Sequence, residues 1–257
     1  MAAIFKCITS FDRTQTVLRC HSCKGYGEYR WFFHPPSLAP YPTEEKRMKT
    51  VELFCGTKSF SNVAKELGHE VFTVDIKHLF VPHLQKDILK LKREELPKEI
   101  DIVWASPPCQ AFSVAAIGSS WCGNYCPKRV ETALGMAYVL KTIELINKIQ
   151  PKYWFIENPR GVLRKMEFMQ QFHRNTVTYC QYGDTRMKPT DIWTNCLEWK
   201  PRPLCKNGDS CHVSAPRGSQ TGTQGLKGDI ERGRIPPDLF YEIFKQMEKN
   251  NDRNTNR

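Results

Sequence analysis

Short apolar runs alternate with segments of helical periodicity along most of this chain. Residues 48–56, MKTVELFCG, predict a buried strand that ends at a glycine, and 59–69 follow with apolar residues at helical spacing. Residues 70–76 and 99–108 predict further strands, with a short candidate strand at 86–91 between them. Because strands and helices alternate, the sequence predicts an α/β fold with a mostly parallel sheet and helices on both faces.

The same alternation continues toward the end of the chain. Residues 128–150 predict a long helix that Pro151 closes, and 152–159 predict another strand. The remaining expected elements are a helical segment at 168–174, strands at 175–182 and 190–195, and a final helix at 235–248 that opens near Pro237.

The charge balance points to a class of partner. The chain has 257 residues and a formal net charge of +11. This balance favours nucleic acid as a partner, although a basic surface kept only for solubility gives the same count. No apolar run reaches the roughly 18 to 20 residues that cross a bilayer, and Lys6, Asp12 and Arg13 interrupt the start where a signal peptide needs an apolar core. We therefore expect an intracellular, cytoplasmic protein without membrane contact, whose 11 cysteines are mostly reduced.

Four residues that could take part in ligand binding or catalysis fall at the ends of predicted strands. They are Gly56, Asp75, Cys109 and Glu157. In sheets of this kind, ligands bind beyond the carboxyl ends of the strands. We therefore expect these four residues to gather along one edge of the sheet.

The turn CGTKSF after the first strand is the first candidate site. Gly56 lets the backbone approach a ligand, and the following helix N-terminus adds a partial positive charge. Asp75 lies 19 residues later, where a carboxylate can accept hydrogen bonds from a ribose. The three glycines of the dinucleotide fingerprint are missing, so an adenosine-type ligand without a pyrophosphate is expected. An ordinary turn beside an exposed acid is the alternative.

The sequence ASPPCQAFS at 105–113 is the second candidate site. Two prolines fix the backbone just before Cys109 and aim its thiol with little freedom. In FIENPRG, at 155–161, Glu157 ends an apolar strand, where a partly desolvated carboxyl can share or donate a proton near neutral pH. A thiol and an acid at neighbouring strand ends suit attack on an electron-poor ring. A buried free cysteine and a salt-bridged acid are the alternatives.

Four motifs, in this order, resemble those of the DNA (cytosine-5)-methyltransferases. They are VELFCG at 51–56, ASPPCQAFS at 105–113, ENPRG at 157–161 and QYGDTRMK at 181–188. The resemblance runs from Met48 to Asn195 with a weaker tail to Met247, and its Pro-Pro-Cys-Gln block is specific. It implies a Rossmann-like, S-adenosylmethionine-dependent methyltransferase fold.

The resemblance also implies a role for each site residue. Cys109 would attack carbon 6 of cytosine and Glu157 would hold N3, while carbon 5 takes the methyl group of S-adenosylmethionine in a base flipped out of the duplex. Arg186 is the third catalytic residue implied. The implied cofactor-binding residues are Phe54, Gly56, Asp75, Ile76, Asp87 and Pro107. The substrate-binding candidates within the matching motifs are Gln110, Ser113, Asn158 and Lys188, and Arg217 of the basic segment 196–235 is a further candidate.

The chain departs from the family pattern at several places, and one of them is that the usual late Gly-Asn motif does not appear. Lys58 stands where a second glycine is usual, and Lys188 replaces an arginine, which removes a planar two-pronged donor. The sizeable target-recognition domain is missing, and only the short basic segment 196–235 stands in its place. We expect this segment to contact DNA phosphates unless it is a solvated loop. We expect a monomer, and a separate partner protein could supply target recognition.

The expected organisation has four parts. Residues 1–47 form an N-terminal extension without a counterpart in the family, which we expect to be dispensable. Residues 48–195 form the catalytic domain, 196–235 form the short Cys- and Gly-containing segment, and 236–257 form the last helix and tail.

The cysteines offer candidate metal ligands. Cys196, Cys205, Cys211 and His212 could form a small structural zinc site that stiffens a segment too short for its own core. The sequence CHSC at 20–23 has metal-like spacing but no second pair nearby. Reduced free thiols are the alternative at both places.

The expected function is cytosine-5 methylation of DNA. A restriction-modification system is one biological role that such an activity could serve. Cytosine-5 methylation of RNA such as tRNA is one alternative. A catalytically weak DNA-binding module on the same fold is another.

Overall fold

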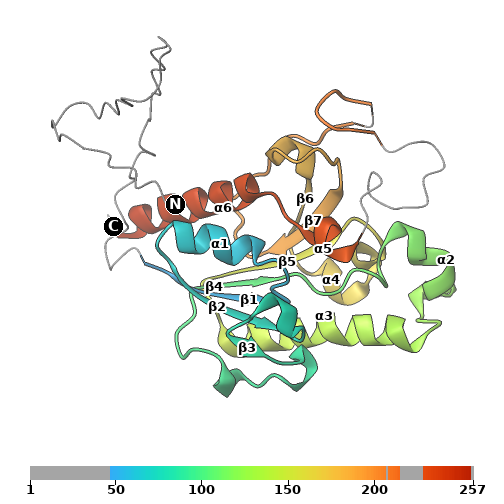
Figure 1. Ribbon diagram of the computed structural model, residues 1–257, viewed down its shortest axis with the longest axis horizontal. Helices are drawn as coiled ribbons and strands as arrows, with labels where there is room; N and C mark the ends of the chain where they lie inside the picture. Colours follow the sequence, from blue (N-terminus) through green and yellow to red (C-terminus); the bar gives the residue numbers. More distant parts are fainter. Residues whose placement is uncertain (1–46, 207, 215–227, 256–257) are drawn as a thin grey trace, which may run out of the picture. The chain divides into compact units, whose positions relative to one another are not determined.

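A seven-stranded sheet forms the centre of the described chain (Figure 1). The computed structural model describes residues 47–206, 208–214 and 228–255. The strands are β1 (Lys49–Leu53), β2 (Glu70–Asp75), β3 (Leu84–Gln85), β4 (Ile102–Ala105), β5 (Tyr153–Pro159), β6 (Arg174–Thr178) and β7 (Pro189–Thr194). The helices are α1 (Ser59–Glu66), α2 (Ile117–Ser120), α3 (Val130–Ile149), α4 (Glu167–Gln170), α5 (Asp229–Gly233) and α6 (Pro237–Thr255). Short 3-10 helices are η2 (His78–Phe80), η3 (Ile88–Lys90), η4 (Arg93–Glu95), η5 (Val114–Ala116), η6 (Gly123–Tyr125), η7 (Val162–Lys165) and η8 (Tyr179–Tyr182).

The strand order is β3-β2-β1-β4-β5-β7-β6. β1 pairs in parallel with β2 and β4, and the pairs β2–β3 and β4–β5 are also parallel. β7 lies antiparallel between β5 and β6. The order 3-2-1-4-5 around a central first strand is that of doubly wound folds, whose ligand crevice lies beyond the carboxyl ends of the strands. The mostly parallel, Rossmann-like sheet that the sequence predicts is confirmed.

Helices cover both faces of the sheet (Figure 1), and an apolar layer packs against each face. On one face, Val51 and Leu53 of β1 pack with Val139 of α3. On the other face, Trp104 of β4 packs with Phe60 and with residues of α6, and its ring lies nearly parallel to that of Phe60 at 5.6 Å between centroids. The alternation of side chains along each strand sends neighbouring residues to opposite layers. The prediction of helices on both faces is confirmed.

Several predicted boundaries differ from the structure. The predicted strand at 86–91 is wrong, because Asp87 accepts a hydrogen bond from the Leu89 N–H (3.0 Å) and starts η3. The predicted strand at 175–182 ends at Thr178, where η8 begins, and the helical segment expected at 168–174 is limited to α4.

Other expectations concern the ends of the chain. The final helix begins at Pro237, as predicted. Among the described residues, the helices are too short or too polar to span a membrane. The extension expected at 1–47 and the CHSC pair lie almost entirely outside the described residues, as does Arg217.

Candidate active site

The turn between β1 and α1 has an unusual backbone. Phe54, Gly56 and Lys58 all have positive φ, at 57°, 44° and 58°. Lys58 adopts the left-handed conformation as the N-cap of α1, which costs a non-glycine residue roughly 1 kcal/mol and explains why glycine is usual there. Its Nζ donates to the Val81 carbonyl at 2.7 Å. A Cβ at Gly56 would meet no atom closer than the Phe54 carbonyl oxygen at 3.9 Å, so this side of the turn is open to a ligand.

Asp75 holds this turn from the end of β2. Its carboxylate accepts hydrogen bonds from the backbone N–H groups of Gly56 (2.9 Å) and Lys77 (2.8 Å), one on each oxygen. Asp75 is buried. Each carboxylate oxygen has two acceptor positions, so the pair of oxygens can also receive hydroxyl donors from a ligand.

A second group of side chains lies next to the β1–α1 turn and consists of Phe54, Asp87 and Tyr138. The rings of Phe54 and Tyr138 meet edge to face, with centroids 5.7 Å apart. Burial and the neighbouring Asp87 carboxylate raise the pKa of Tyr138. Sequence reasoning missed Tyr138, because nothing in the predicted long helix at 128–150 marks it as a site residue. Ile76 follows Asp75 and is 55% exposed, which leaves its side chain free to pack against a ligand.

The backbone around Cys109 is held from several sides. The Cys109 carbonyl accepts from the N–H groups of Phe112 (3.0 Å) and Ser113 (3.1 Å). The Asn158 side-chain amide donates to the Pro107 carbonyl at 3.0 Å. Asn158 is fully buried, so it positions the loop and does not face solvent as a substrate ligand would. Cys109 itself is half-buried.

Two glycines allow this close packing. A Cβ at Gly161 would lie 2.0 Å from the Phe112 carbonyl oxygen, and one at Gly135 of α3 would lie 2.9 Å from the Ala111 Cβ. The Val162 N–H also donates to the Phe112 carbonyl at 2.8 Å. The residues after β5 therefore contact the Cys109 loop directly. Ser113 lies in this contact, in a bridge with Gly161, whereas Gln110 is exposed.

Glu157 lies at the end of β5, beside the Cys109 loop. It is buried, and its Oε1 accepts a hydrogen bond from the Tyr179 hydroxyl at 3.0 Å. Burial, followed by the Glu157 charge, raises the pKa of Tyr179 well above its usual value, so the phenol stays protonated and acts as the donor. Sequence reasoning missed Tyr179, because it lies within the stretch 175–182 that predicted a strand.

The charges around Cys109 oppose one another. Burial and the Glu157 carboxylate raise the pKa of the Cys109 thiol, whereas Lys188 and Arg232 lower it. Lys188 Nζ donates to the Arg232 carbonyl (2.8 Å) and lies 4.7 Å from the centre of the Tyr179 ring. Burial lowers the pKa of Lys188, and Glu157 counters that effect. Lys188, predicted as a substrate ligand, is thus within electrostatic reach of both predicted catalytic groups.

Arg186 has a different position from the one its predicted role suggests. Its Nε and Nη2 bind the Asp184 carboxylate, and its remaining N–H groups donate to the carbonyls of Glu231 (3.0 Å), Arg232 (3.2 Å) and Arg234 (3.0 Å). These contacts use all five guanidinium donors. Arg186 as a whole is 4% exposed. Arg186 therefore fixes the α5 region, and the cations that act on Cys109 are Lys188 and Arg232.

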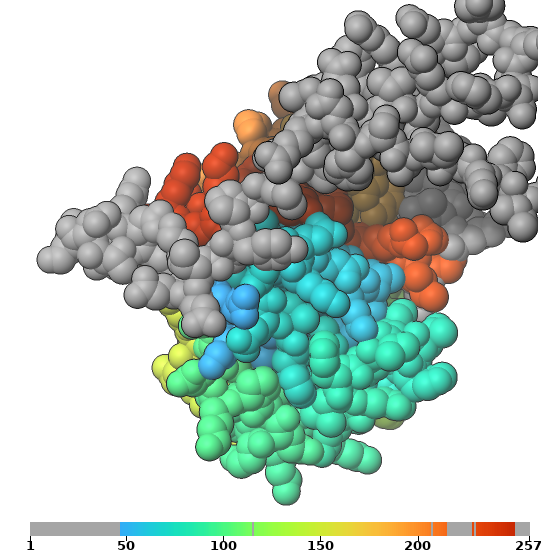
Figure 2. All heavy atoms as spheres, turned by 60° about the vertical axis from the view of Figure 1, so that its left-hand side comes forward, coloured from blue at the N-terminus to red at the C-terminus, as the bar shows by residue number. Residues whose placement is uncertain are grey.

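A cavity of about 790 Å³ lies beside this group of residues. Thr57 and Ser59 line it together with Asp184, Arg186 and Arg234. Figure 2 shows the orange residues around 230–235 against the blue and cyan surface of the β1–α1 region. Neither Cys109 nor Asp75 is among the lining residues, so the candidate site is defined by the converging side chains and not by this cavity.

The predicted zinc ligands are only partly brought together. Cys205, Cys211 and His212 lie close to one another, and Cys180 at η8 joins them. Cys196 is buried in the apolar layer beneath α6 and lies outside this cluster. Spacing along the chain favoured Cys196, whereas the fold brings in Cys180.

Comparisons with known proteins identify the family. The family model for C-5 cytosine-specific DNA methylases matches residues 48–176. A Frog virus 3 (isolate Goorha) protein named "Probable DNA (cytosine-5)-methyltransferase" is 31% identical over 219 residues, which cover 77% of this chain and 99% of that protein. The chain belongs to the C-5 cytosine-specific DNA methylase family. The enzyme class and fold implied by the sequence motifs are therefore confirmed.

Two further relatives are more distant. The type II methyltransferase M.NgoPII of Neisseria gonorrhoeae is 27% identical over 133 residues, which cover 48% of this chain and 36% of that protein. A solved structure of a DNMT2 variant from Spodoptera frugiperda is 20% identical with a TM-score of 0.42, and the match covers 65% of this chain and 57% of that one.

Proposed function

We propose that this C-5 cytosine-specific DNA methylase transfers a methyl group from S-adenosylmethionine to carbon 5 of cytosine in DNA, through a transient bond between Cys109 and carbon 6. One observation carries the proposal. The Cys109 loop is tied to the end of β5 by the Asn158–Pro107 hydrogen bond, close enough to Glu157 for its charge to raise the Cys109 pKa. A nucleophile and an acid are thereby held at neighbouring strand ends.

The first step forms the Cys109 Sγ–carbon 6 bond, and the ring electron pair moves toward carbon 5. Because the pKa of the thiol is raised, its proton passes to the Glu157 carboxylate as the bond forms, and Lys188 and Arg232 favour the thiolate. Glu157 then donates this proton to N3, which neutralises the negative charge gained by the ring, while the Tyr179 hydroxyl fixes the orientation of that carboxyl. After methylation, water takes the carbon 5 proton, and the electron pair of that bond restores the double bond between carbons 5 and 6. The Sγ–carbon 6 bond breaks at the same time, and N3 returns its proton through Glu157 to the thiolate.

The residues around the β1–α1 turn fit an adenosine-type cofactor. The open side of Gly56, the carboxylates of Asp75 and Asp87, and the rings of Phe54 and Tyr138 supply a backbone approach, hydroxyl acceptors and an aromatic wall. When bound, S-adenosylmethionine supplies an electrophilic methyl group. Ile76 and Pro107 are proposed to complete the walls of this pocket.

The substrate base must leave the duplex. Carbon 6 is stacked inside DNA and inaccessible to a half-buried thiol, so the cytosine is flipped into the site. The exposed Gln110 beside Cys109 and the basic residues of the segment 196–235 are proposed to contact the displaced base and the phosphates. Arg186 acts by positioning this segment.

The test is transfer of labelled methyl groups to a DNA library and to tRNA in parallel, with bisulfite reading of the products. Wild type is expected to methylate cytosine in DNA. Cys109→Ala should abolish transfer and still bind S-adenosylmethionine, because the thiol is not part of the cofactor pocket. Cys122→Ser removes an exposed thiol from the following loop and should retain activity.

A second readout tests the covalent bond itself. DNA that carries 5-fluorocytosine should form an adduct that survives denaturation, because fluorine at carbon 5 cannot leave as a proton. Normal methylation by Cys109→Ala, or an adduct mapped to another cysteine, would reject Cys109 as the nucleophile. Transfer to tRNA alone would reject DNA as the substrate.

A further inference from the structure

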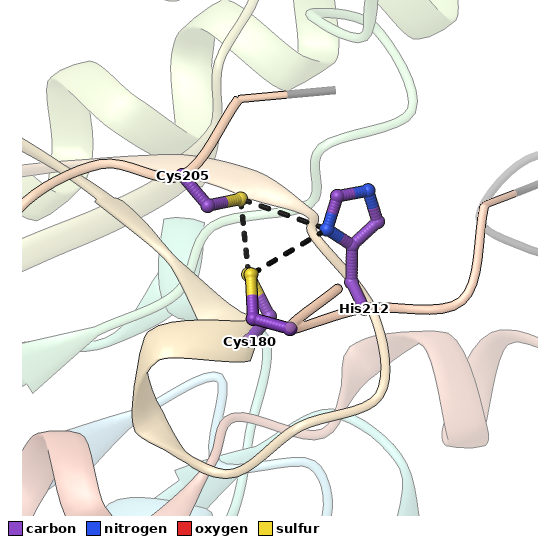
Figure 3. Close-up of side chains that lie close together, drawn as sticks. Cys180, Cys205 and His212 are labelled. Carbon is purple, nitrogen blue, oxygen red and sulfur yellow. Dashed lines mark hydrogen bonds between the residues drawn. The ribbon is translucent and has the colours of Figure 1, made fainter. Parts of the chain in front are cut away.

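Four side chains near η8 point their ligand atoms at one another. The Sγ atoms of Cys180, Cys205 and Cys211 and a ring nitrogen of His212 all lie within 4.8 Å of each other. Figure 3 shows Cys180, Cys205 and His212 converging from separate segments. Cys180 and Cys205 are buried, His212 is half-buried and Cys211 is exposed. The three cysteines are not joined by disulfides.

The distances suit a tetrahedral zinc ion. With zinc–sulfur bonds of about 2.3 Å and zinc–nitrogen bonds of about 2.0 Å, the edges of the tetrahedron are about 3.8 Å between sulfurs and about 3.5 Å between sulfur and nitrogen. The His212 Nδ1 lies 3.8 Å from Cys205 Sγ and 3.7 Å from Cys211 Sγ, and Cys211 Sγ lies 3.6 Å from Cys180 Sγ. The Cys180–Cys205 pair is shorter, at 3.1 Å, so these two sulfurs would have to separate by about 0.7 Å to reach the edge length of the tetrahedron.

The backbone holds the ligands in place from both sides of the cluster. The Cys205 N–H donates to Thr178 Oγ1 at 3.2 Å, and the Val213 N–H donates to the Thr185 carbonyl at 2.8 Å. These two bonds pin the ends of the segment 205–213 against the chain on either side of η8. The ligand set is therefore prearranged by contacts that do not involve the ligand atoms.

We propose that Cys180, Cys205, Cys211 and His212 bind one structural Zn²⁺. Three cysteines and one histidine form a standard closed zinc set, which leaves no position for water or substrate. The ion ties the segment 205–214 to η8, the element whose Tyr179 contacts Glu157.

The segment needs such a link, because it has little core of its own. Between Trp199 and the end of the described stretch at residue 214, Cys205 is the buried apolar side chain, while Leu204 and Val213 are more than half exposed. A short segment with so little buried area is commonly stabilised by a metal or a disulfide. This segment takes the place of the large target-recognition domain in the family pattern. The ion would anchor it to η8, next to the Cys109 and Glu157 site.

The experiment measures zinc in the purified full-length protein by mass spectrometry of the metal. We expect one zinc per chain, lost in Cys180→Ser and in Cys205→Ser. Cys196→Ser, a buried thiol outside the cluster, is the matched control and should keep one zinc. Replacement by Co²⁺ should give the visible absorption of a tetrahedral thiolate site in wild type and in Cys196→Ser only. A chelator should lower the melting temperature of both of these proteins by several degrees.

Cys211→His separates loss of the metal from loss of the fold. It exchanges one zinc ligand for another at an exposed position, so it should keep the metal, whereas Cys211→Ala should lose it or bind it at least tenfold more weakly. Zinc-free wild-type protein that also fails to take up added Zn²⁺ or Co²⁺ would overturn the proposal. A disulfide between two of the cysteines under reducing purification, or zinc lost from Cys196→Ser and kept by Cys180→Ser, would overturn it equally.

Discussion

At the scale of single residues, the Cys109 thiol is subject to two opposing influences. Burial and Glu157 raise its pKa, while Lys188 and Arg232 lower it. Since the net direction is upward, the thiol is mostly protonated at neutral pH and its reactivity depends on the fraction that ionises. Each nearby cation therefore controls how much thiolate is present.

Lys188→Met should move the pH dependence of Cys109 alkylation upward by about 1 pH unit, because removal of a nearby positive charge disfavours the thiolate. The measurement is the rate of iodoacetamide labelling of the Cys109 peptide, followed by mass spectrometry between about pH 7 and pH 10. Peptide mapping separates Cys109 from the exposed Cys122 and Cys126. Lys188→Arg keeps the charge and should restore most of the wild-type profile. A profile unchanged by Lys188→Met would show that this lysine does not act on the thiol.

Gly161 tests the packing under the Cys109 loop. Gly161→Ala would place a methyl group 2.0 Å from the Phe112 carbonyl oxygen, so the loop or the end of β5 must shift. We expect a loss of about 1 to 3 kcal/mol in the free energy of unfolding, together with reduced methyl transfer. Urea unfolding measures the first effect. Gly118→Ala is the control, because a Cβ there meets no atom within 4 Å. Equal behaviour of the two variants would show that the close approach is not required.

At the scale of elements, a buried carboxyl joins β1 to α1. Glu52 of β1 accepts hydrogen bonds from the backbone N–H groups of Phe60 (3.4 Å) and Ser61 (3.0 Å) in the first turn of α1. Burial raises the pKa of Glu52 from 4.5 to about 7, although both bonds favour the charged form. Above about pH 7 the buried group must ionise, whereas in the unfolded chain it ionises near pH 4.5 at little cost.

Glu52→Gln should therefore become more stable relative to wild type as the pH rises. Below about pH 4.5 the Glu52 carboxyl of the wild type is protonated in both the folded and the unfolded state, so its ionisation does not change the free energy of unfolding. Between about pH 4.5 and pH 7 the folded state loses stability, by up to about 3 kcal/mol once ionisation is complete. Urea unfolding of both proteins at about pH 5 and pH 8 measures this change. Glu70→Gln, an exposed carboxyl on β2, is the matched control. A difference between Glu52→Gln and wild type that does not grow with pH would contradict the argument.

The elements also show what sequence reasoning could reach. Buried parallel strands are continuous apolar runs, so their ends, and with them Asp75, Cys109 and Glu157, could be placed from the sequence. The end of β6 at Thr178 was concealed, because the residues of η8, Tyr-Cys-Gln-Tyr, continue the strand-like pattern after the strand has ended. Tyr179, the partner of Glu157, was missed for this reason.

Contacts between distant segments have no periodic signal. Arg186 was predicted from motif position to act on the substrate, yet its donors bind Asp184 and the carbonyls of residues 231–234. Cys180 was likewise hidden, since its partners Cys205 and Cys211 are distant along the chain and meet it only through folding. Local spacing favoured Cys196, which the fold buries in the core.

At the scale of the whole molecule, segments far apart in sequence meet at one edge of the sheet. The β1–α1 turn, the Cys109 loop, the end of β5, η8 and α5 all contribute groups to it. The net charge of +11 belongs to the complete chain, whereas α5 itself holds two acidic residues and one arginine, Arg232. Arg232 is exposed and lowers the pKa of Cys109, so its charge acts at this edge, and the affinity of a polyanion bound there should depend on the salt concentration.

Arg232→Gln should reduce the salt dependence of DNA binding. The logarithm of the association constant should fall linearly with the logarithm of salt concentration, and removal of one phosphate contact should lower the slope by about 1. Fluorescence anisotropy of a labelled duplex between about 50 and 200 mM salt measures this slope. Lys148→Gln removes the same charge from α3, where Lys148 is already paired with Glu144 at 2.6 Å, and should leave the slope unchanged. If both variants change the slope equally, binding follows the overall charge of the molecule and Arg232 has no specific contact with the phosphates.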